Sequence, residues 1–143
     1  AVDKSAEALK VAAQNAKRIG VSNIAFFEGS WYEPFMTTHA DENNKFDIIV
    51  SNPPYIDPND PHLAGLTDEP ISALIADNKG MADICHIVKT APQFLQPHGL
   101  LAIEHGYDQG EQVRGIFLSN GFGDVITVKD YGDNERVTLG VIN

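Results

Sequence analysis

Four residues at the end of an apolar segment carry the groups needed to hold a planar NH2 group. Asn52, Pro53, Pro54 and Tyr55, here called the NPPY corner, directly follow the segment "FDIIVS". Asn52 has a side-chain carbonyl that accepts hydrogen bonds, and the two prolines offer only carbonyl acceptors because they lack an N–H. Pro54 restricts Pro53 to an extended conformation, so the Pro53 carbonyl points in a defined direction. Tyr55 adds a flat ring that can stack on the plane attached to the NH2 group.

Such a grip has a chemical use. The nitrogen of an amide or aromatic amine is a weak nucleophile because its lone pair is delocalised. Acceptors aimed at both N–H bonds stabilise the positive charge that develops on this nitrogen in the transition state. Held in line with an electrophilic methyl group, the nitrogen can displace a sulfonium leaving group without a separate base. The alternative is that Asn-Pro and Pro-Pro merely end a strand as ordinary turn dipeptides. We favour the chemical interpretation because this string is rare at average residue usage.

The elements that would position the corner alternate between strands and helices. Residues 46–51 form a continuous apolar run, which is typical of a strand covered on both faces. Apolar spacing, glycines and prolines predict the other elements. These are helices over 4–19 (closed by Gly20), from Met81 toward Pro97-His98-Gly99, and over 108–121, and strands over 23–29, 100–105, 124–130 and 136–142. Residues 56–79 are predicted as a long loop with one helical turn around Ile71–Ile75. The order predicts an α/β fold whose mostly parallel sheet ends in an antiparallel hairpin.

Three positions fall beyond the carboxyl ends of predicted parallel strands, where such sheets bind ligands. They are Asp3, Ser30-Trp31 and the NPPY corner. Asp3 either accepts hydrogen bonds from ribose hydroxyls or caps the following helix, and the sequence does not separate these roles. Trp31 either stacks on an adenine or covers the core, and the residue alone favours the core. Glu104-His105, at the end of a strand, are predicted to make structural hydrogen bonds.

Composition narrows the class of protein. The chain has 143 residues, 43% of them apolar, which suits a single domain. Its net charge of −10 weighs against a nucleic-acid partner. No run approaches the roughly 20 apolar residues of a membrane span, so we expect no membrane partner. The lone cysteine, Cys85, is read as a small core residue in a reducing compartment. We therefore expect a cytoplasmic protein. The five histidines show no ligand spacing, so we expect no metal site.

The NPPY corner after an apolar strand resembles the signature of amino-directed methyltransferases that use S-adenosylmethionine. More specifically, the chain is similar to the HemK/PrmC family, the protein-(glutamine-N5) methyltransferases that modify the GGQ glutamine of peptide chain release factors. The resemblance runs nearly end to end and rests on "AVDKSAEALKVAAQNA", "FDIIVSNPPYIDPNDPHL", "EPISALIA", "GMADICHIV", "LLAIEHGYDQGEQV" and "KDYGDNERVTLG". The segments around the corner, more than the corner itself, point to a protein substrate.

The resemblance implies a Rossmann-like class I methyltransferase fold and assigns site residues. Asp3 would contact the ribose of S-adenosylmethionine, and Ser30 and Trp31 its adenine region. Asn52 would face the transferred methyl group, and the whole NPPY corner, Asn52 through Tyr55, would hold the substrate glutamine. Asn52, Pro53 and Tyr55 are thus the expected catalytic residues. The product of the cofactor would be S-adenosylhomocysteine, and the partner a release factor rather than a nucleic acid.

The chain departs from the family pattern in three places. Ser30 stands where many members carry an Asp, which weakens an expected adenine contact. The segment between Leu63 and Glu69 is about two residues shorter than expected. The N-terminal strand, the glycine-rich loop and the helical substrate-binding domain have no counterpart, so residues 1–143 are expected to form a single, partial catalytic domain. The strand without a counterpart would lie between those ending at Asp3 and Ser51, leaving two open sheet edges.

Two alternative functions stay open. A DNA or RNA adenine-N6 methyltransferase could use the same corner, although the negative charge and the lack of a Lys/Arg stripe disfavour it. A catalytically inactive fragment that only binds a partner is favoured, for this chain alone, by the missing glycine-rich loop.

Overall fold

The computed structural model describes residues 1–36, 45–56 and 80–143. The chain divides into two compact units, Ala1–Asn44 and Lys45–Asn143, and each is described by itself. The predicted helical turn around Ile71–Ile75 and the short segment between Leu63 and Glu69 lie outside the described residues. The prediction that residues 1–143 form one domain stays a prediction. In the described parts of the chain, we find no helix with the length and hydropathy that crossing a membrane requires.

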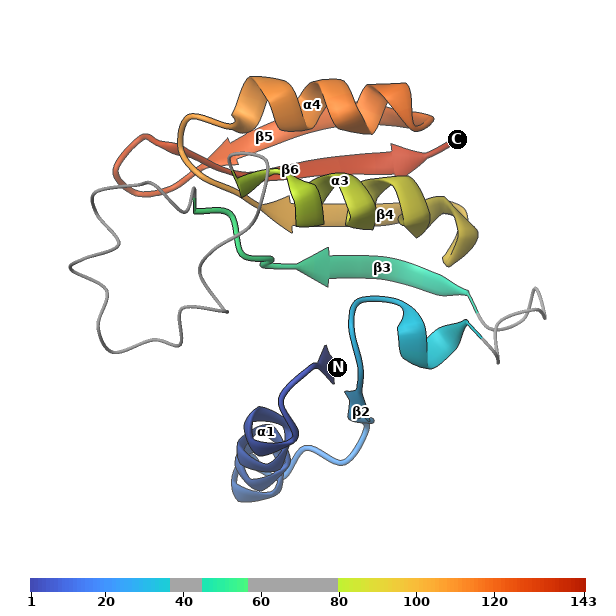
Figure 1. The fold of residues 1–143 in the computed structure, drawn as a ribbon, viewed down its shortest axis with the longest axis vertical. Helices are drawn as coiled ribbons and strands as arrows, with labels where there is room; N and C mark the ends of the chain where they lie inside the picture. The colour runs from blue at the N-terminus through green and yellow to red at the C-terminus, as the bar shows by residue number, and fades with distance from the viewer. Residues whose placement is uncertain (37–44, 57–79) are drawn as a thin grey trace. The chain divides into compact units, whose positions relative to one another are not determined.

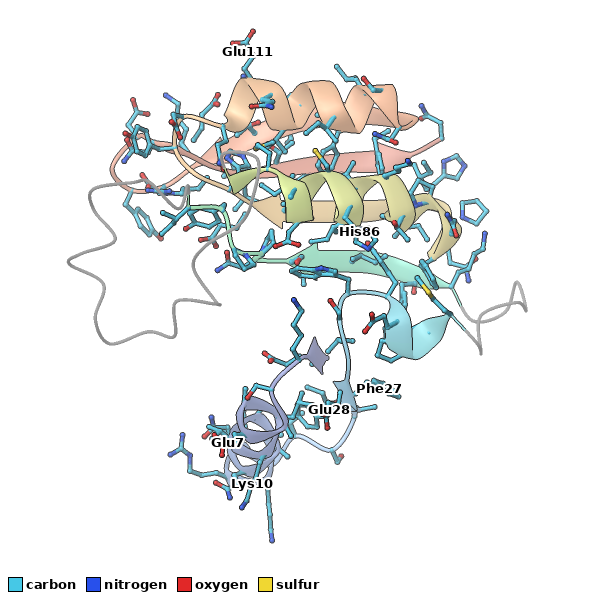
Figure 2. The ribbon with its side chains drawn as sticks, in the orientation of Figure 1. Glu7, Lys10, Phe27, Glu28, His86 and Glu111 are labelled. Carbon is cyan, nitrogen blue, oxygen red and sulfur yellow. The ribbon has the colours of Figure 1, made fainter. Side chains whose placement is uncertain are left out.

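The first unit is built around a capped helix (Figure 1). In α1 (Ala6–Ile19), the Ser5 hydroxyl accepts a hydrogen bond from the Ala8 N–H, and Gly20 ends the helix at φ 77°. The predicted helix is confirmed, but it begins at Ala6 because Ser5 satisfies a free N–H group of the first turn. Exposed side chains such as Glu7 and Lys10 project from its outer surface (Figure 2).

A short parallel pair of strands accompanies this helix. β1 (Val2–Asp3) pairs with β2 (Phe27–Glu28), with Asp3 opposite Glu28. The 3-10 helix η1 (Glu33–Phe35) follows. The predicted strand over 23–29 is wrong in length, because only two residues of β2 find a partner in the short β1.

The second unit contains a mixed four-stranded sheet. Its elements are β3 (Phe46–Ser51), α3 (Ala82–Thr90), the 3-10 helix η5 (Ala91–Gln93), β4 (Leu95–Glu104), α4 (Gly110–Ser119), β5 (Phe122–Lys129) and β6 (Glu135–Ile142). The strand order is β3-β4-β6-β5, in which β3 and β4 are parallel and the other two pairs antiparallel. This arrangement confirms the predicted α/β fold with its antiparallel C-terminal hairpin.

Helices α3 and α4 lie side by side along this sheet (Figure 1). Their inward faces place Ile84, Val88 and Phe117 among the fully buried side chains. The Phe117 ring packs against Phe122 at the start of β5, with centroids 5.1 Å apart. Met81, Ile84 and Val88 therefore form a buried face. Cys85 was predicted to be a core residue, and this is wrong, because its side chain is only half-buried.

Two other expectations are corrected. Pro97-His98-Gly99 does not end the preceding helix but lies inside β4, where the pairing skips from Leu95 to Leu100 and His98 adopts φ 63°. Helix α3 ends earlier because Pro92, which lacks an N–H group, falls in η5 directly after it.

Among the described residues, the apolar strand β3 has one exposed face. Ile48 and Val50, which share one face of β3, are 60% and 74% exposed. A continuous apolar run reports residue types and not whether another element lies on each face, so burial was overestimated here.

Candidate active site

The NPPY corner leaves the sheet beside the end of β4. Ser51, the last residue of β3, pairs with Ile103 near the end of β4. Since the two strands are parallel, the corner and the residues after Ile103 emerge at the same edge of the sheet. Asn52 is exposed, whereas Pro53 is fully buried and Tyr55 half-buried. Pro53 therefore anchors the corner in the core while Asn52 stays accessible to a ligand.

Tyr55 is held by two side chains, one from the last residue of β4 and one from the loop after it. Its phenol O–H donates to Glu104 Oε1 at 3.3 Å. The side-chain amide of Gln109 donates from Nε2 to the Tyr55 carbonyl at 3.0 Å, and its Oε1 accepts from the Gly106 N–H at 2.8 Å. Sequence reasoning treated "EHGYDQGE" only as part of a resemblance and missed Gln109. Its position in the loop after a strand parallel to β3 was the signal that could have found it.

His105 is the first residue after β4. It is completely buried, and each of its ring nitrogens has a partner. Nδ1 is 2.8 Å from the Gly106 carbonyl, and Nε2 is 2.9 Å from Thr138 Oγ1. A carbonyl can only accept, so Nδ1 carries the proton and Nε2 accepts from the Thr138 hydroxyl. Burial lowers the pKa of His105, which favours this neutral form. The predicted structural role of His105 is confirmed.

A charged pair continues the same network. Arg114 donates to Glu135 Oε1 and to Thr127 Oγ1, each at 2.9 Å. The Thr127 and Thr138 hydroxyl oxygens are 2.8 Å apart. Because the Thr138 proton points to His105, Thr127 must be the donor to Thr138. Arg136, the residue after Glu135, pairs instead with Asp130 at 3.0 Å.

In the first unit, Asp3 and Trp31 follow the two paired strands. Asp3 Oδ1 accepts from the Ser5 N–H at 2.8 Å, and Ser5, not Asp3, caps α1. The Gly29 N–H donates to the Asp3 carbonyl at 3.1 Å, which joins the ends of β1 and β2. Lys4 Nζ lies 5.7 Å from the centre of the Trp31 ring. The structure thus brings the strand-end residues Asp3 and Trp31 to one edge of this unit.

The backbone of Trp31 is unusual. It has φ 51°, in the left-handed region that bulky side chains rarely adopt. The Trp31 side chain is half-buried, so it is not simply a core residue. Just before it, the Ser30 N–H donates to Glu33 Oε2 at 2.8 Å, which fixes the turn into η1. A strained backbone at a half-exposed aromatic residue favours a binding role for Trp31. Within the described ranges, no cluster of three His, Cys, Asp or Glu residues suits a metal ion.

Comparison with known proteins identifies the family. A family model described as a methyltransferase domain matches residues 1–123. The chain belongs to the methyltransferase domain family. It is 46% identical over 142 residues to the release factor glutamine methyltransferase of Salmonella typhimurium, covering 98% of this chain and 49% of that protein. It is 48% identical over 141 residues to the enzyme of the same name from Vibrio cholerae, covering 97% and 48%. The resemblance to the HemK/PrmC family is therefore confirmed, and the chain spans about half the length of the curated relatives it matches.

Solved methyltransferases share the fold. A methyltransferase from Pyrococcus furiosus superposes with a TM-score of 0.67 at 17% identity, covering 98% of this chain and 60% of that one. The protein-(glutamine-N5) methyltransferase (release factor-specific) from Alicyclobacillus acidocaldarius gives 0.56 at 22% identity, covering 99% and 77%. This methyltransferase family member thus has the Rossmann-like α/β fold of class I enzymes.

Proposed function

We propose that this chain contributes the amide-binding corner for methyl transfer from S-adenosylmethionine to N5 of the GGQ glutamine in peptide chain release factors, in the cytoplasm. The observation that carries the proposal is the NPPY corner itself. Asn52 is exposed, Pro53 is buried, and Tyr55 is fixed by Gln109. The 46% identity to a release factor glutamine methyltransferase over 142 residues supports a glutamine side chain as the substrate.

The corner would activate the glutamine amide by accepting a hydrogen bond from each of its two N–H groups. The side-chain carbonyl of Asn52 and the main-chain carbonyl of Pro53 are the two acceptors, and the Tyr55 ring packs on the amide plane. These contacts strengthen as the nitrogen becomes tetrahedral and positively charged, so they favour the transition state over bound substrate. A nitrogen–carbon bond forms while the sulfur–carbon bond of the donor breaks, and the amide nitrogen then loses one proton to water.

The residues of the first unit fit a nucleoside. The Asp3 carboxylate is exposed at the end of β1, where ribose hydroxyls are commonly bound. Trp31 would wall the adenine, and Ser30 would lie beside it. When bound, S-adenosylmethionine supplies a methyl group made electrophilic by its sulfonium. Asn52 would face this methyl group as well as the substrate amide.

The test is a methylation assay with S-adenosylmethionine labelled in its methyl group. The chain is incubated with a release factor, with the same factor carrying Ala in place of the GGQ glutamine, and with an adenine-containing oligonucleotide. Label on the first substrate alone supports the proposal. Label on the oligonucleotide would instead support an adenine-N6 methyltransferase. Binding of release factor without label on any substrate would support the inactive, partner-binding alternative.

A further inference from the structure

We propose that Gln109 is a positioning residue for the NPPY corner. It would set the direction of the corner by bridging the Tyr55 carbonyl to the end of β4. The inference rests on the proposed function, because the corner is assigned there to the substrate amide. Gln109 itself touches no reacting atom in this assignment.

The bridge uses both ends of one side-chain amide. Gln109 Oε1 accepts from the Gly106 N–H at 2.8 Å, and Nε2 donates to the Tyr55 carbonyl at 3.0 Å. Gln109 is 9% exposed, so water competes little for these hydrogen bonds. One planar group thus joins the loop after β4 to a main-chain atom of the corner, which fixes their separation.

Gly80 lies close to the same carbonyl. It has φ 76°, and a Cβ built on it would collide with the Tyr55 carbonyl. The same Cβ would come within 2.9 Å of Gln109 Nε2. The Gly80 backbone therefore packs close to both the Tyr55 carbonyl and the Gln109 amide, and it leaves no room for a side chain beside their hydrogen bond.

The start of the loop after β4, where the Gln109 side chain binds Gly106, is itself fixed. The Gly106 carbonyl accepts from buried His105, which accepts from Thr138. Thr138 accepts from Thr127, which accepts in turn from Arg114. Every hydrogen bond in this series therefore runs in one direction, from the Arg114 guanidinium toward the end of β4. A polarised series of this kind strengthens each bond and makes Gly106 a rigid reference point.

The consequence concerns rate more than affinity. Tyr55 is held at its hydroxyl by Glu104 and at its carbonyl by Gln109, so its ring has a fixed orientation two residues after Pro53. A shift of about 1 Å in such an arrangement can cost on the order of 100-fold in rate, since the nitrogen must lie in line with the methyl group.

The test uses Gln109→Glu in the full chain, with Gln112→Glu as a matched control. The glutamate keeps the acceptor for the Gly106 N–H but replaces the donor to Tyr55 with a carboxylate oxygen. Gln112 is an exposed residue of α4, three positions further on, so its substitution adds the same charge without facing the corner. Two readouts are measured in each protein: the 13C shift of the Tyr55 carbonyl by NMR with carbonyl-labelled tyrosine, and kcat and KM for methyl transfer to release factor.

We expect Gln109→Glu to move the Tyr55 carbonyl signal and to lower kcat on the order of 10- to 100-fold, with KM changed less than about threefold. Gln112→Glu should leave both unchanged. An unmoved carbonyl signal in Gln109→Glu would overturn the bridge. A moved signal with unchanged kcat, or a drop matched by Gln112→Glu, would overturn the positioning role. Absence of methyl transfer by the wild-type chain would instead refute the proposed function, and the carbonyl signal alone would then decide the bridge.

Discussion

His105 Nε2 lies 2.9 Å from the hydroxyl oxygen of Thr138, in a part of the sheet that water does not reach. His105 directly follows β4, and Thr138 lies in the neighbouring strand β6. Their hydrogen bond requires an unprotonated Nε2. The folded arrangement of β4 and β6 therefore requires His105 to be neutral.

This requirement predicts a stability loss in mild acid. Burial lowers the pKa of His105 below its ordinary 6.5, and nearby Arg114 and Arg136 act in the same direction. The hydrogen bond to the Gly106 carbonyl and the charge of Glu135 raise the pKa; each is weaker than burial but stronger than either arginine. As the pH falls below 6.5, the unfolded chain binds a proton that the folded chain does not, so the free energy of unfolding falls.

We expect the slope to approach about 1.4 kcal/mol per pH unit. The check is urea unfolding at several values between pH 5.5 and 7.5, in the wild type and in His105→Gln. The variant should be less stable at neutral pH but lose less stability on acidification. His86→Gln is the control, because His86 is exposed on α3 (Figure 2). An unchanged pH dependence in His105→Gln would contradict the prediction.

Asn52→Ala should impair turnover far more than affinity. Its side-chain carbonyl is assigned to the nitrogen of the substrate, where charge develops only in the transition state. Losing one such contact costs on the order of 100-fold in kcat. The dissociation constant for release factor, measured separately by calorimetry, should change less than about threefold. Asn15→Ala, an exposed change in α1, is the control. Equal losses in turnover and affinity, or no loss in either, would refute the role of Asn52.

The sequence predicted the elements with strong local signals. Strand β3 was placed at its observed bounds, because an apolar run ends at a rigid Asn-Pro-Pro corner. The end of α1 followed from Gly20, whose φ of 77° suits glycine. These features depend on neighbouring residues, so one sequence is enough to find them.

Features that depend on distant partners were missed. Gln109 and Tyr55 are 54 positions apart, and their contact exists only because β3 and β4 are parallel neighbours. The helix end predicted at Pro97-His98-Gly99 is instead an irregular part of β4, because β4 already pairs with β3 at Leu95, opposite Phe46. The left-handed backbone of Trp31 had no signal either, since residues of its kind rarely adopt that conformation.

Trp31→Ala should abolish or strongly weaken binding of S-adenosylmethionine. The ring is assigned to the adenine region, and base–aromatic stacking is worth about 1–3 kcal/mol. This corresponds to roughly a 5- to 150-fold rise in the dissociation constant, measured by calorimetric titration. Trp31→Phe, which keeps an aromatic face, should retain most of the affinity. Wild-type affinity in Trp31→Ala would exclude Trp31 from the site, and no binding by the wild type would contradict the proposed cofactor site.

Gly80→Ala should destabilise the fold more than Gly121→Ala, although both glycines have left-handed backbones, with φ of 76° and 87°. An added Cβ costs about 1–2 kcal/mol in either backbone. At Gly121 the nearest atom is 3.8 Å away, on the Ile142 side chain, so little more is lost. At Gly80 the new methyl group meets the Tyr55 carbonyl, and overpacking adds about 1–3 kcal/mol.

Urea unfolding of the two variants measures this difference. The Tyr55 carbonyl signal should move only in Gly80→Ala, because only there must the NPPY corner yield to the new side chain. Equal stability losses, with an unmoved signal, would mean that the Gly80 backbone does not confine the Tyr55 carbonyl.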